Sequence, residues 1–581
     1  MSAVARSVTP TPELKQWPSL RTVIGCCVAA AVAVAIDAYF NAQQGYISRS
    51  PDYDGVGYLV TAQGAYGALR SFHLRTALHL LNSNIAPLWI TALTIQQFIF
   101  GEGTWQFFTA RFWGVAPLLT LVYWIVRNRS SRSMAIAAVG LTALLPIASA
   151  GVRASSWEFF SGQAIYGEFW SLGDLRPDFF AIVMALCSIV PLAERYRAPT
   201  LSTYIVSGAF AGAAVLAKPS TAPIVLFAWV LTLGVIWFWN RGRRSILRMT
   251  ALAGVVMAVL IAPWAVRGGI SATIDRYYSA AVTYKGAYST VLDFPDLIMY
   301  FLRTIPTQLG HIEAWFVIAG SIVLVVALLR RQLEFPEWIY GGLAMLFYAS
   351  LTSTTNKNVN VGVYFNLSLW IFFLAGASRL VSRQWPVVTT KRGSPFVLAS
   401  IAVYVVVIYG LGAVALANWP ANETRSNAQL LSVTKEVAHE MGHFISAGQC
   451  FAQAPGPGWP ASLEYFMTDS QGRQPYSTSI DVDPSLPINE YVAQASQCPA
   501  VISYREDITE VAKMFVAFPV RQPYLRAVAD WVRSPSSGYT LDRSWQFTDI
   551  ASNGLHTLGH YQGYSLTVDL FIRTSGSPIS P

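Results

Sequence analysis

The sequence predicts an α-helical polytopic membrane protein that ends in an α+β domain outside the cytoplasm. Of the 581 residues, 53% are hydrophobic and only 12% are charged, and the mean hydropathy is +0.41. Soluble domains carry about 25% charged residues, so the composition excludes an ordinary soluble protein. The net charge of +9 does not indicate nucleic-acid binding, because the basic residues form short clusters between apolar runs. Such clusters are typical of cytoplasmic loops.

About eleven apolar runs of roughly 17–25 residues are each long enough to cross a membrane as a helix. Counting the run 85–101 as another span would put the later basic clusters on the wrong side, so we predict that it lies in the outer interface. The first run is too long for a cleaved signal peptide and lacks a clear cleavage site. The expected spans are residues 20–40, 107–127, 134–151, 179–195, 202–218, 221–240, 250–267, 313–330, 337–353, 363–379 and 396–417. With the N-terminus inside, this count places the following clusters in the cytoplasm: Arg127, Arg129 and Arg132; Arg195 and Arg197; Arg241, Arg243, Arg244 and Arg248; Arg330 and Arg331; Arg379, Arg383, Lys391 and Arg392.

The remaining segments are expected on the outer side. They are the loops 41–106, 152–178, 268–312 and 353–362 and a polar domain of ordinary size, residues 418–581. Cys450 and Cys498 of that domain would meet an oxidising compartment and could form a disulfide. We interpret Cys26, Cys27 and Cys187 as apolar residues of the spans.

A short acidic segment, Ser50 to Tyr58, follows the first span and contains Asp52 and Asp54. Carboxylates close to hydrocarbon are costly, which favours a functional interpretation. Pro-Asp-x-Asp-Gly is also good turn chemistry. The segment alone leaves both interpretations open.

Five motifs occur in an order that resembles one known superfamily. They are Asp54-x-x-x-Tyr58; Ile85-Ala86-Pro87-Leu88-Trp89-Ile90 with Phe100-Gly101 and Arg111; Leu175-Arg176-Pro177-Asp178-Phe179-Phe180; Leu216-Ala217-Lys218-Pro219; and Lys357 ahead of Tyr364. Over about residues 20–380, this series resembles the GT-C glycosyltransferases. The similarity is to the branch that contains lipid A aminoarabinose transferases and protein O-mannosyltransferases.

The resemblance implies a GT-C-like membrane catalytic domain over residues 1–417. It also implies transfer of a sugar from a polyprenyl-phosphate donor to a hydroxyl on an envelope lipid, glycan or protein acceptor. The expected setting is the outer side of a bacterial inner membrane, with membrane lipids as neighbours.

Such a transfer needs a carboxylate to accept the hydroxyl proton and cations to stabilise the leaving phosphate. Asp54 is the candidate base, and Asp178 would orient acceptor or sugar hydroxyls. The expected phosphate contacts are Lys218, Lys357 and Arg111, and the expected substrate contacts are Asp52, Tyr58, Tyr364 and Arg176. Two structural alternatives stay open, because Lys218 could be an interfacial anchor and Asp178 a helix N-cap.

Two departures from the family pattern bear on metal binding. Asn82-Ser83 stands where the family has Glu-Lys, and Gly55 follows Asp54 where the family has a second acid. These differences argue against a metal site on the family's pattern and leave a divalent metal cofactor as an open alternative.

A second motif, His439-Glu440-Met441-Gly442-His443, matches the zinc-protease signature H-E-x-x-H. We expect a helix from about Asn427 to Glu440, ended by Gly442, and a strand over Phe444–Ala447. Zinc needs a third ligand and none follows nearby, although His556 and His560 are candidates from afar. A membrane-anchored zinc protease is therefore one alternative function. A multi-span transporter is the other, although the sequence shows no internal repeat.

Overall fold

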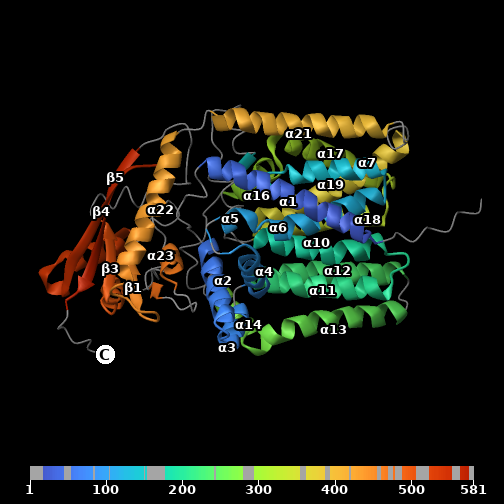
Figure 1. Cartoon of the computed structure of the whole chain (residues 1–581). Coiled ribbons are helices and arrows are strands. Elements are labelled where there is room, and N and C mark those ends of the chain that lie inside the picture. The colour runs from blue at the N-terminus through green and yellow to red at the C-terminus, as the bar shows by residue number, and fades with distance from the viewer. Residues whose placement is uncertain are drawn as a thin grey trace, which may run out of the picture.

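A computed structural model describes the fold of the chain over most of its length. The structure describes residues 17–44, 54–82, 86–101, 103, 105–149, 151–152, 177–240, 244–278, 293–353, 361–385, 393–417, 421–453, 460–468, 475–477, 487–504, 522–551 and 563–574. Long, roughly parallel helices form one body, and a smaller mixed α/β body lies at one end of them (Figure 1). The predicted fold class, a multi-span helical membrane protein with a small C-terminal sheet, is confirmed.

Every predicted span overlaps a helix. These helices are α1 (Leu20–Gln43), α6 (Phe112–Arg127), α7 (Arg132–Ala143), α10 (Asp178–Glu194), α11 (Leu201–Ala217), α12 (Ala222–Trp239), α13 (Arg244–Val266), α17 (His311–Leu329), α18 (Phe335–Ser353), α19 (Gly362–Gln384) and α21 (Ser394–Ala417). By length and composition, six of the described helices could cross a membrane alone: α1, the run Pro219–Trp239, α13, α17, α19 and α21. Shorter apolar helices, including α6, α7 and α11, complete the bundle.

Helix α7 is shorter than its predicted span, which reached residue 151. Its last helical residue is Ala143, three residues before Pro146. A proline inside a helix removes a backbone donor and clashes with the preceding turn, so the chain leaves the helix before reaching it. The hydroxyl of Ser149 then donates a 2.7 Å hydrogen bond to the carbonyl of Ala143.

Short helices gather at the end of the bundle that faces the C-terminal body (Figure 1). They include α2 (Asp54–Arg70), α3 (Leu74–Leu81), α4 (Pro87–Phe100), α5 (Gln106–Thr109), α14 (Gly269–Tyr278) and α16 (Phe294–Leu309). Helix α4 is the one predicted over 85–101. One face of it buries Trp89, Ile90 and Leu93, whereas Phe98 and Ile99 on the other face are exposed. This two-faced pattern is typical of a helix at a boundary between protein and membrane.

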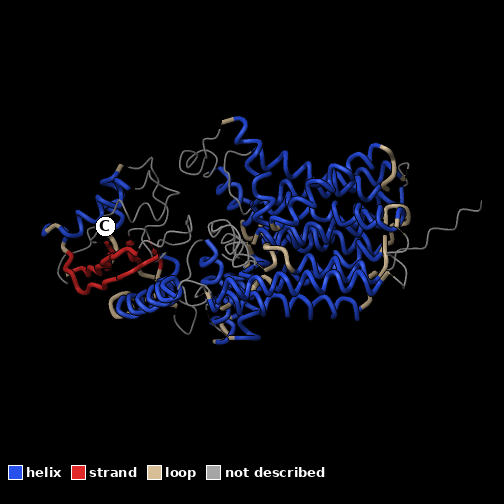
Figure 2. The backbone as a smooth tube through the Cα atoms, turned by 90° about the horizontal axis from the view of Figure 1, so that it is seen from above, coloured by secondary structure: helices blue, strands red, loops and turns tan. Residues whose placement is uncertain are grey.

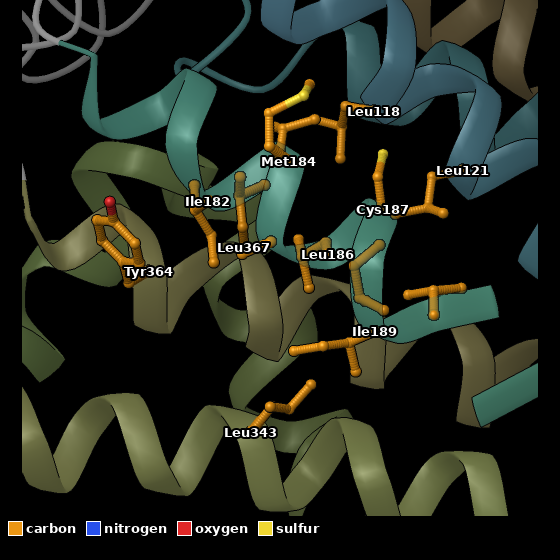
Figure 3. Packing of buried hydrophobic residues seen from close by; sticks show 14 of the residues in the cluster. Leu118, Leu121, Ile182, Met184, Leu186, Cys187, Ile189, Leu343, Tyr364 and Leu367 are labelled. Atoms are coloured by element: carbon orange, nitrogen blue, oxygen red, sulfur yellow. The ribbon is translucent and has the colours of Figure 1, made fainter. Parts of the chain in front are cut away.

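Helix α10 forms the centre of the membrane bundle. It is apolar on all sides, and every residue from Phe180 to Glu194 is buried. A helix that is hydrophobic all round is stable only in such a core. Figure 3 shows its side chains packed between those of α6, α18 and α19. Because α10 is held by this packing, its first residue, Asp178, has a fixed position in the bundle.

A buried ionic network joins four elements at the opposite end of the bundle. The Arg129 guanidinium lies 2.6 Å from both Glu194 and Glu337, and all three side chains are fully buried. Arg379 lies 3.0 Å from Glu337, and the Tyr340 hydroxyl donates a 2.6 Å bond to Glu194. Buried charges require such partners. The sequence indicated Arg129 and Arg379 only as topology signals, but both also tie α10, α18 and α19 together.

The C-terminal body is a five-stranded mixed sheet with helices on both faces (Figure 2). Its order is β2 (Tyr476–Ser477), β1 (Cys450–Gln453), β3 (Ala500–Tyr504), β5 (Gly563–Arg573) and β4 (Tyr539–Ala551). The first three strands are parallel, and β3, β5 and β4 are antiparallel. Alternate residues point to opposite faces: Ile502 and Leu570 pack with α22 (Ala421–Met441), and Val501 and Phe571 pack with α26 (Gln522–Arg533). The helix α24 (Ile488–Ala495) lies beside α26.

The predicted strand over Phe444–Ala447 is wrong. These residues form a turn and an irregular segment, and β1 begins only at Cys450. The Ser446 amide donates to the side chain of Gln449 at 2.8 Å, and Gly448 has a φ of 85°. A positive φ suits glycine and breaks an extended chain. The apolar residues Phe444 and Ile445 thus belong to the turn and irregular segment that follow α22.

Cys450 and Cys498 form the disulfide that the sequence suggested. It joins the start of β1 to the residue two before β3, across a separation of 48 residues. Closing a loop of that length stabilises a domain by about 4 kcal/mol in the chain-entropy treatment.

We expect Cys450 and Cys498 to resist alkylation in the folded protein until a reductant is added. Peptide mass spectrometry after iodoacetamide treatment, with and without dithiothreitol, measures this directly. Reduction should also lower the unfolding temperature of the C-terminal body. Free labelling of both thiols before reduction would contradict the pairing.

Candidate functional site

An ion pair between Asp178 and Lys218 lies where α10 begins and α11 ends. The Lys218 ammonium contacts Oδ1 of Asp178, and the two side chains are 18% and 4% exposed. Asp178 is the first residue of α10, where a carboxylate is favoured by the helix dipole. Its second oxygen, Oδ2, is buried and has no hydrogen-bond partner among the residues that the structure describes. A buried acceptor of this kind calls for a hydrogen-bond donor, which a substrate hydroxyl would supply.

The pair also bears on the two structural alternatives. The N-cap of α10 is Pro177, so Asp178 is not the capping residue. Lys218 ends α11 and turns back to Asp178, so its ammonium is not extended toward a lipid interface as an anchor would be. Each residue is held by the other.

Tyr364 lies next to this pair through the turn that follows Lys218. The turn is the 3-10 helix η2 (Pro219–Thr221). The Thr221 hydroxyl donates to the carbonyl of Lys218 at 3.0 Å and lies 2.8 Å from the hydroxyl of Tyr364. The Tyr364 ring is buried at the start of α19, and Figure 3 shows its hydroxyl pointing away from the apolar cluster. The turn thus connects Lys218 and Tyr364, two predicted site residues. Sequence reasoning missed Thr221, a polar residue three positions beyond a candidate lysine.

Arg111 forms a second buried ion pair, with Asp37 of α1. Its Nη1 lies 2.9 Å from Oδ2 of Asp37, while its Nε has no partner among the described residues. Oδ1 of Asp37 accepts the Gly151 amide at 2.7 Å. A Cβ on Gly151 would lie only 2.6 Å from the side-chain amide nitrogen of Asn41. A larger residue at position 151 would therefore force Asn41 or the Gly151 backbone to move, and the hydrogen bond between Gly151 and Asp37 would be disturbed. Sequence reasoning missed Asp37, although a carboxylate inside an apolar run is the signal that marks such a position.

Helix α4 is fixed against the elements that carry these residues. Trp89 packs on Phe180 in the first turn of α10, with ring centroids 5.2 Å apart. Near its other end, Gln96 bonds to the Thr109 hydroxyl at 2.8 Å and accepts the Trp113 ring N–H at 3.1 Å. One short helix therefore bridges the region of Asp178 and that of Arg111.

The other candidate residues differ in how much of each the structure describes. Asp52, Arg176 and Lys357 lie outside the described residues. Asp54 is the first residue of α2, and only its backbone is described. Tyr58, one turn later, is partly buried against the membrane core. Asn82 ends α3 and donates to the Leu78 carbonyl at 2.8 Å, and Ser83 is not described.

The H-E-x-x-H motif lies at the end of α22. Gly442 follows the last helical residue and its amide donates to the Ala438 carbonyl at 3.0 Å, as predicted for a terminating glycine. His439 and His443 are exposed with ring centroids 5.0 Å apart, and Glu440 pairs with Arg543 at 3.0 Å. Within the described ranges no three His, Cys, Asp or Glu residues are grouped as metal ligands. His556 and His560 lie outside those ranges.

We expect His439→Ala and His443→Ala to leave sugar transfer close to the wild-type rate, because both rings project from the C-terminal body and Glu440 is engaged by Arg543. Initial rates on the purified variants and zinc content by plasma mass spectrometry measure this. One zinc per chain in the wild type that is lost in either variant would contradict the expectation and favour the protease alternative.

Comparison with known proteins gives the fold. No protein-family model matches the chain, and no curated protein matches it. The crystal structure of ArnT from Cupriavidus metallidurans bound to undecaprenyl phosphate is similar, with a TM-score of 0.50 and 13% identity over 94% of this chain and 97% of that one. ArnT from the same organism in the apo state has a TM-score of 0.48 and 15% identity over 84% and 94%. The chain has the fold of ArnT, and this confirms at the level of the fold the resemblance that its motifs indicated.

Proposed function

We propose that the protein transfers a sugar from a polyprenyl-phosphate donor to a hydroxyl acceptor. The observation that carries the proposal is the Asp178–Lys218 pair, which combines a cation that reaches solvent with a buried, half-unpaired carboxylate. The fold supports it, because the similar ArnT crystal contains undecaprenyl phosphate. The acceptor is an envelope lipid, a glycan or a protein.

In this reaction the acceptor oxygen attacks the anomeric carbon of the sugar. The bond from that carbon to the phosphate oxygen breaks, and the polyprenyl phosphate leaves with the electron pair. The acceptor proton passes to a carboxylate, which we assign to Asp54. Asp54 is the first residue of α2.

Lys218 and Asp178 are assigned to the two substrates. A lysine ammonium has three donors, and Asp178 takes one of them, so two remain for phosphate oxygens. Charge-assisted bonds of this kind stabilise the leaving group as its charge grows. Oδ2 of Asp178 accepts a hydrogen bond from a sugar or acceptor hydroxyl. The hydroxyl of Tyr364, at the start of α19, donates to a substrate oxygen.

We assign Arg111 to the phosphate of the sugar donor, to which its Nε–H would donate a hydrogen bond. Asp37 holds the other side of the guanidinium and sets its orientation. Lys357 is assigned to the same phosphate, and Asp52, Tyr58 and Arg176 are assigned to substrate contacts. No metal ion is assigned to this site.

We infer the arrangement in the cell from the charge pattern of the sequence. We assign residues 1–417 to the membrane catalytic domain and 418–581 to an extracytoplasmic domain. The loops 41–106, 152–178, 268–312 and 353–362 share the outer side with the site, and the membrane is the bacterial inner membrane.

The test is release of radiolabelled sugar from a polyprenyl-phosphate donor by the purified protein in detergent. The wild type should transfer label to envelope lipid extract or another hydroxyl acceptor, and Lys218→Met should not. Arg303→Met is the matched control, because Arg303 pairs with Asp296 on an exposed surface and such pairs contribute little. Uptake of a solute by proteoliposomes without any transfer would instead favour a transporter.

A further inference from the structure

The corner between α2 and α3 exposes an aromatic ring on a backbone conformation that disfavours it. Phe72 is 86% exposed and has a φ of 59°, in the left-handed region. Its amide donates to the Leu69 carbonyl at 3.1 Å, and the next amide, that of His73, donates to the Ala68 carbonyl at 2.8 Å. These two bonds end a helix in the Schellman motif, where glycine is the usual left-handed residue. A phenylalanine kept at such a strained, exposed position points to a role for its ring.

Helix α3 continues this corner with one side buried and the other exposed. Ala77 is buried, and Leu81, one turn later, packs against the membrane core. Leu74 and Leu78, also one turn apart, form an exposed apolar stripe. Arg75, next to that stripe, is exposed as well. An apolar stripe beside a basic residue is typical of a helix that lies in the interface between lipid and water.

The end of a membrane span fixes the level of α3. Helix α13 is long and apolar enough to cross a membrane alone, and its last residue, Val266, is exposed. The next residue, Arg267, donates from Nη1 to the carbonyl of Leu78 at 3.0 Å. Figure 1 shows α3 beside this end of α13, at the edge of the bundle. Helix α3 therefore lies where α13 leaves the hydrocarbon.

The corner carries positive charge. The sequence has no acidic residue between Asp54 and Glu102, whereas Arg70 and Arg75 are both exposed. Arg70 lies 5.9 Å from the ring centroid of Tyr66, and within the described ranges neither arginine forms an ion pair. The positive-inside bias disfavours exposed arginines at the end of the bundle that we assign to the outer side. An anionic partner would explain why they are kept there.

We propose that the α2–α3 corner is an interfacial anchor that binds an anionic phospholipid. The Arg75 guanidinium binds the phosphate of the headgroup, and the Phe72 ring and the Leu74–Leu78 stripe enter the acyl region beneath it. Apolar side chains beside basic ones hold surface helices in membranes in this way, and basic residues at the surface attract anionic lipids. The leaflet is the one at the outer end of the bundle.

The anchor is separate from the candidate site. Arg70 and Asp54 lie at opposite ends of α2, about 24 Å apart along the helix axis. None of the anchor residues Phe72, Leu74, Arg75 and Leu78 is assigned to the donor or the acceptor. The proposal therefore does not depend on the proposed reaction, and it is tested by lipid binding.

The first test uses a photoactivatable phosphatidylglycerol, with its diazirine near the glycerol, in nanodiscs of phosphatidylcholine that contain the full-length protein. Illumination should label peptides that contain α3, measured relative to α21, a span with little buried surface. Phe72→Gly should remove most of the α3 labelling. It should not lower the unfolding temperature, because glycine suits the left-handed backbone at this position. Phe72→Trp keeps an aromatic ring and should keep the labelling.

Headgroup selectivity provides the second test. Unlabelled phosphatidylglycerol should compete with the α3 labelling better than phosphatidylcholine does in the wild type. Arg75→Gln should reduce this preference about fivefold, the effect of one basic residue at an anionic surface. Arg303→Gln is the matched control and should leave the preference unchanged, because Arg303 is also exposed but already pairs with Asp296 at 2.7 Å.

Three results would overturn the proposal. Full α3 labelling in Phe72→Gly would mean that the ring does not hold the corner in lipid. Equal competition by the two phospholipids in the wild type would mean that the corner does not select an anionic headgroup. An equal loss of preference in Arg75→Gln and Arg303→Gln would mean that the selectivity reflects general surface charge and not this corner.

Discussion

Replacing Asp54 with Asn should lower the turnover of sugar transfer by at least about 10²-fold. An amide of nearly the same size cannot accept a proton at neutral pH, and general-base catalysis contributes about 10²–10⁴-fold. The fold should survive, because Asn keeps the volume and is tolerated at a helix start. Donor binding should change little, since the phosphate is assigned to Lys218, Lys357 and Arg111. Single-turnover rates and donor affinity on the same preparations separate the two effects.

Asp52→Asn is the matched control for this experiment. It removes a carboxylate two residues away, ahead of α2 and outside the Asp-x-x-x-Tyr motif, and should have a milder effect. If Asp52→Asn abolished turnover while Asp54→Asn stayed near normal, the base would have to be reassigned to Asp52.

Most of the membrane fold could be predicted from the sequence, because lipid imposes a simple constraint. Every spanning segment must satisfy its own backbone, so apolar length marks each helix. The ends were less predictable. Pro146 shortens α7, and the corner at Gly448 replaces a predicted strand, since turn geometry depends on single side-chain bonds such as that of Gln449.

The partners within the site could not be predicted. The sequence singled out Asp178 and Lys218 separately, 40 positions apart, but only the packing of α10 against α11 shows that they pair. Arg111 was expected at the phosphate, and its buried partner Asp37 is 74 positions away. Periodicity indicates which residues are buried, whereas the pairing of two charges depends on how helices cross.

The second large effect is expected from separating the Asp178–Lys218 pair. Lys218→Met removes the phosphate contact and should lower turnover by about 10²-fold or more, as for the loss of one oxyanion donor. It also leaves the Asp178 carboxylate, only 4% exposed, without its partner. Breaking a buried pair from one side costs about 3 kcal/mol, so the unfolding temperature should fall as well.

The double variant Lys218→Met/Asp178→Asn distinguishes catalysis from stability. Removing both charges of a buried pair is often neutral for stability, so the unfolding temperature should return toward that of the wild type. Turnover should stay low, because the double variant still lacks the lysine that would bind the phosphate and the carboxylate that would bind a substrate hydroxyl. Thermal unfolding and initial rates measured together decide this. Recovery of both quantities in the double variant would mean that the pair only joins α10 to α11, and the phosphate would then have to be bound by Arg111 and Lys357.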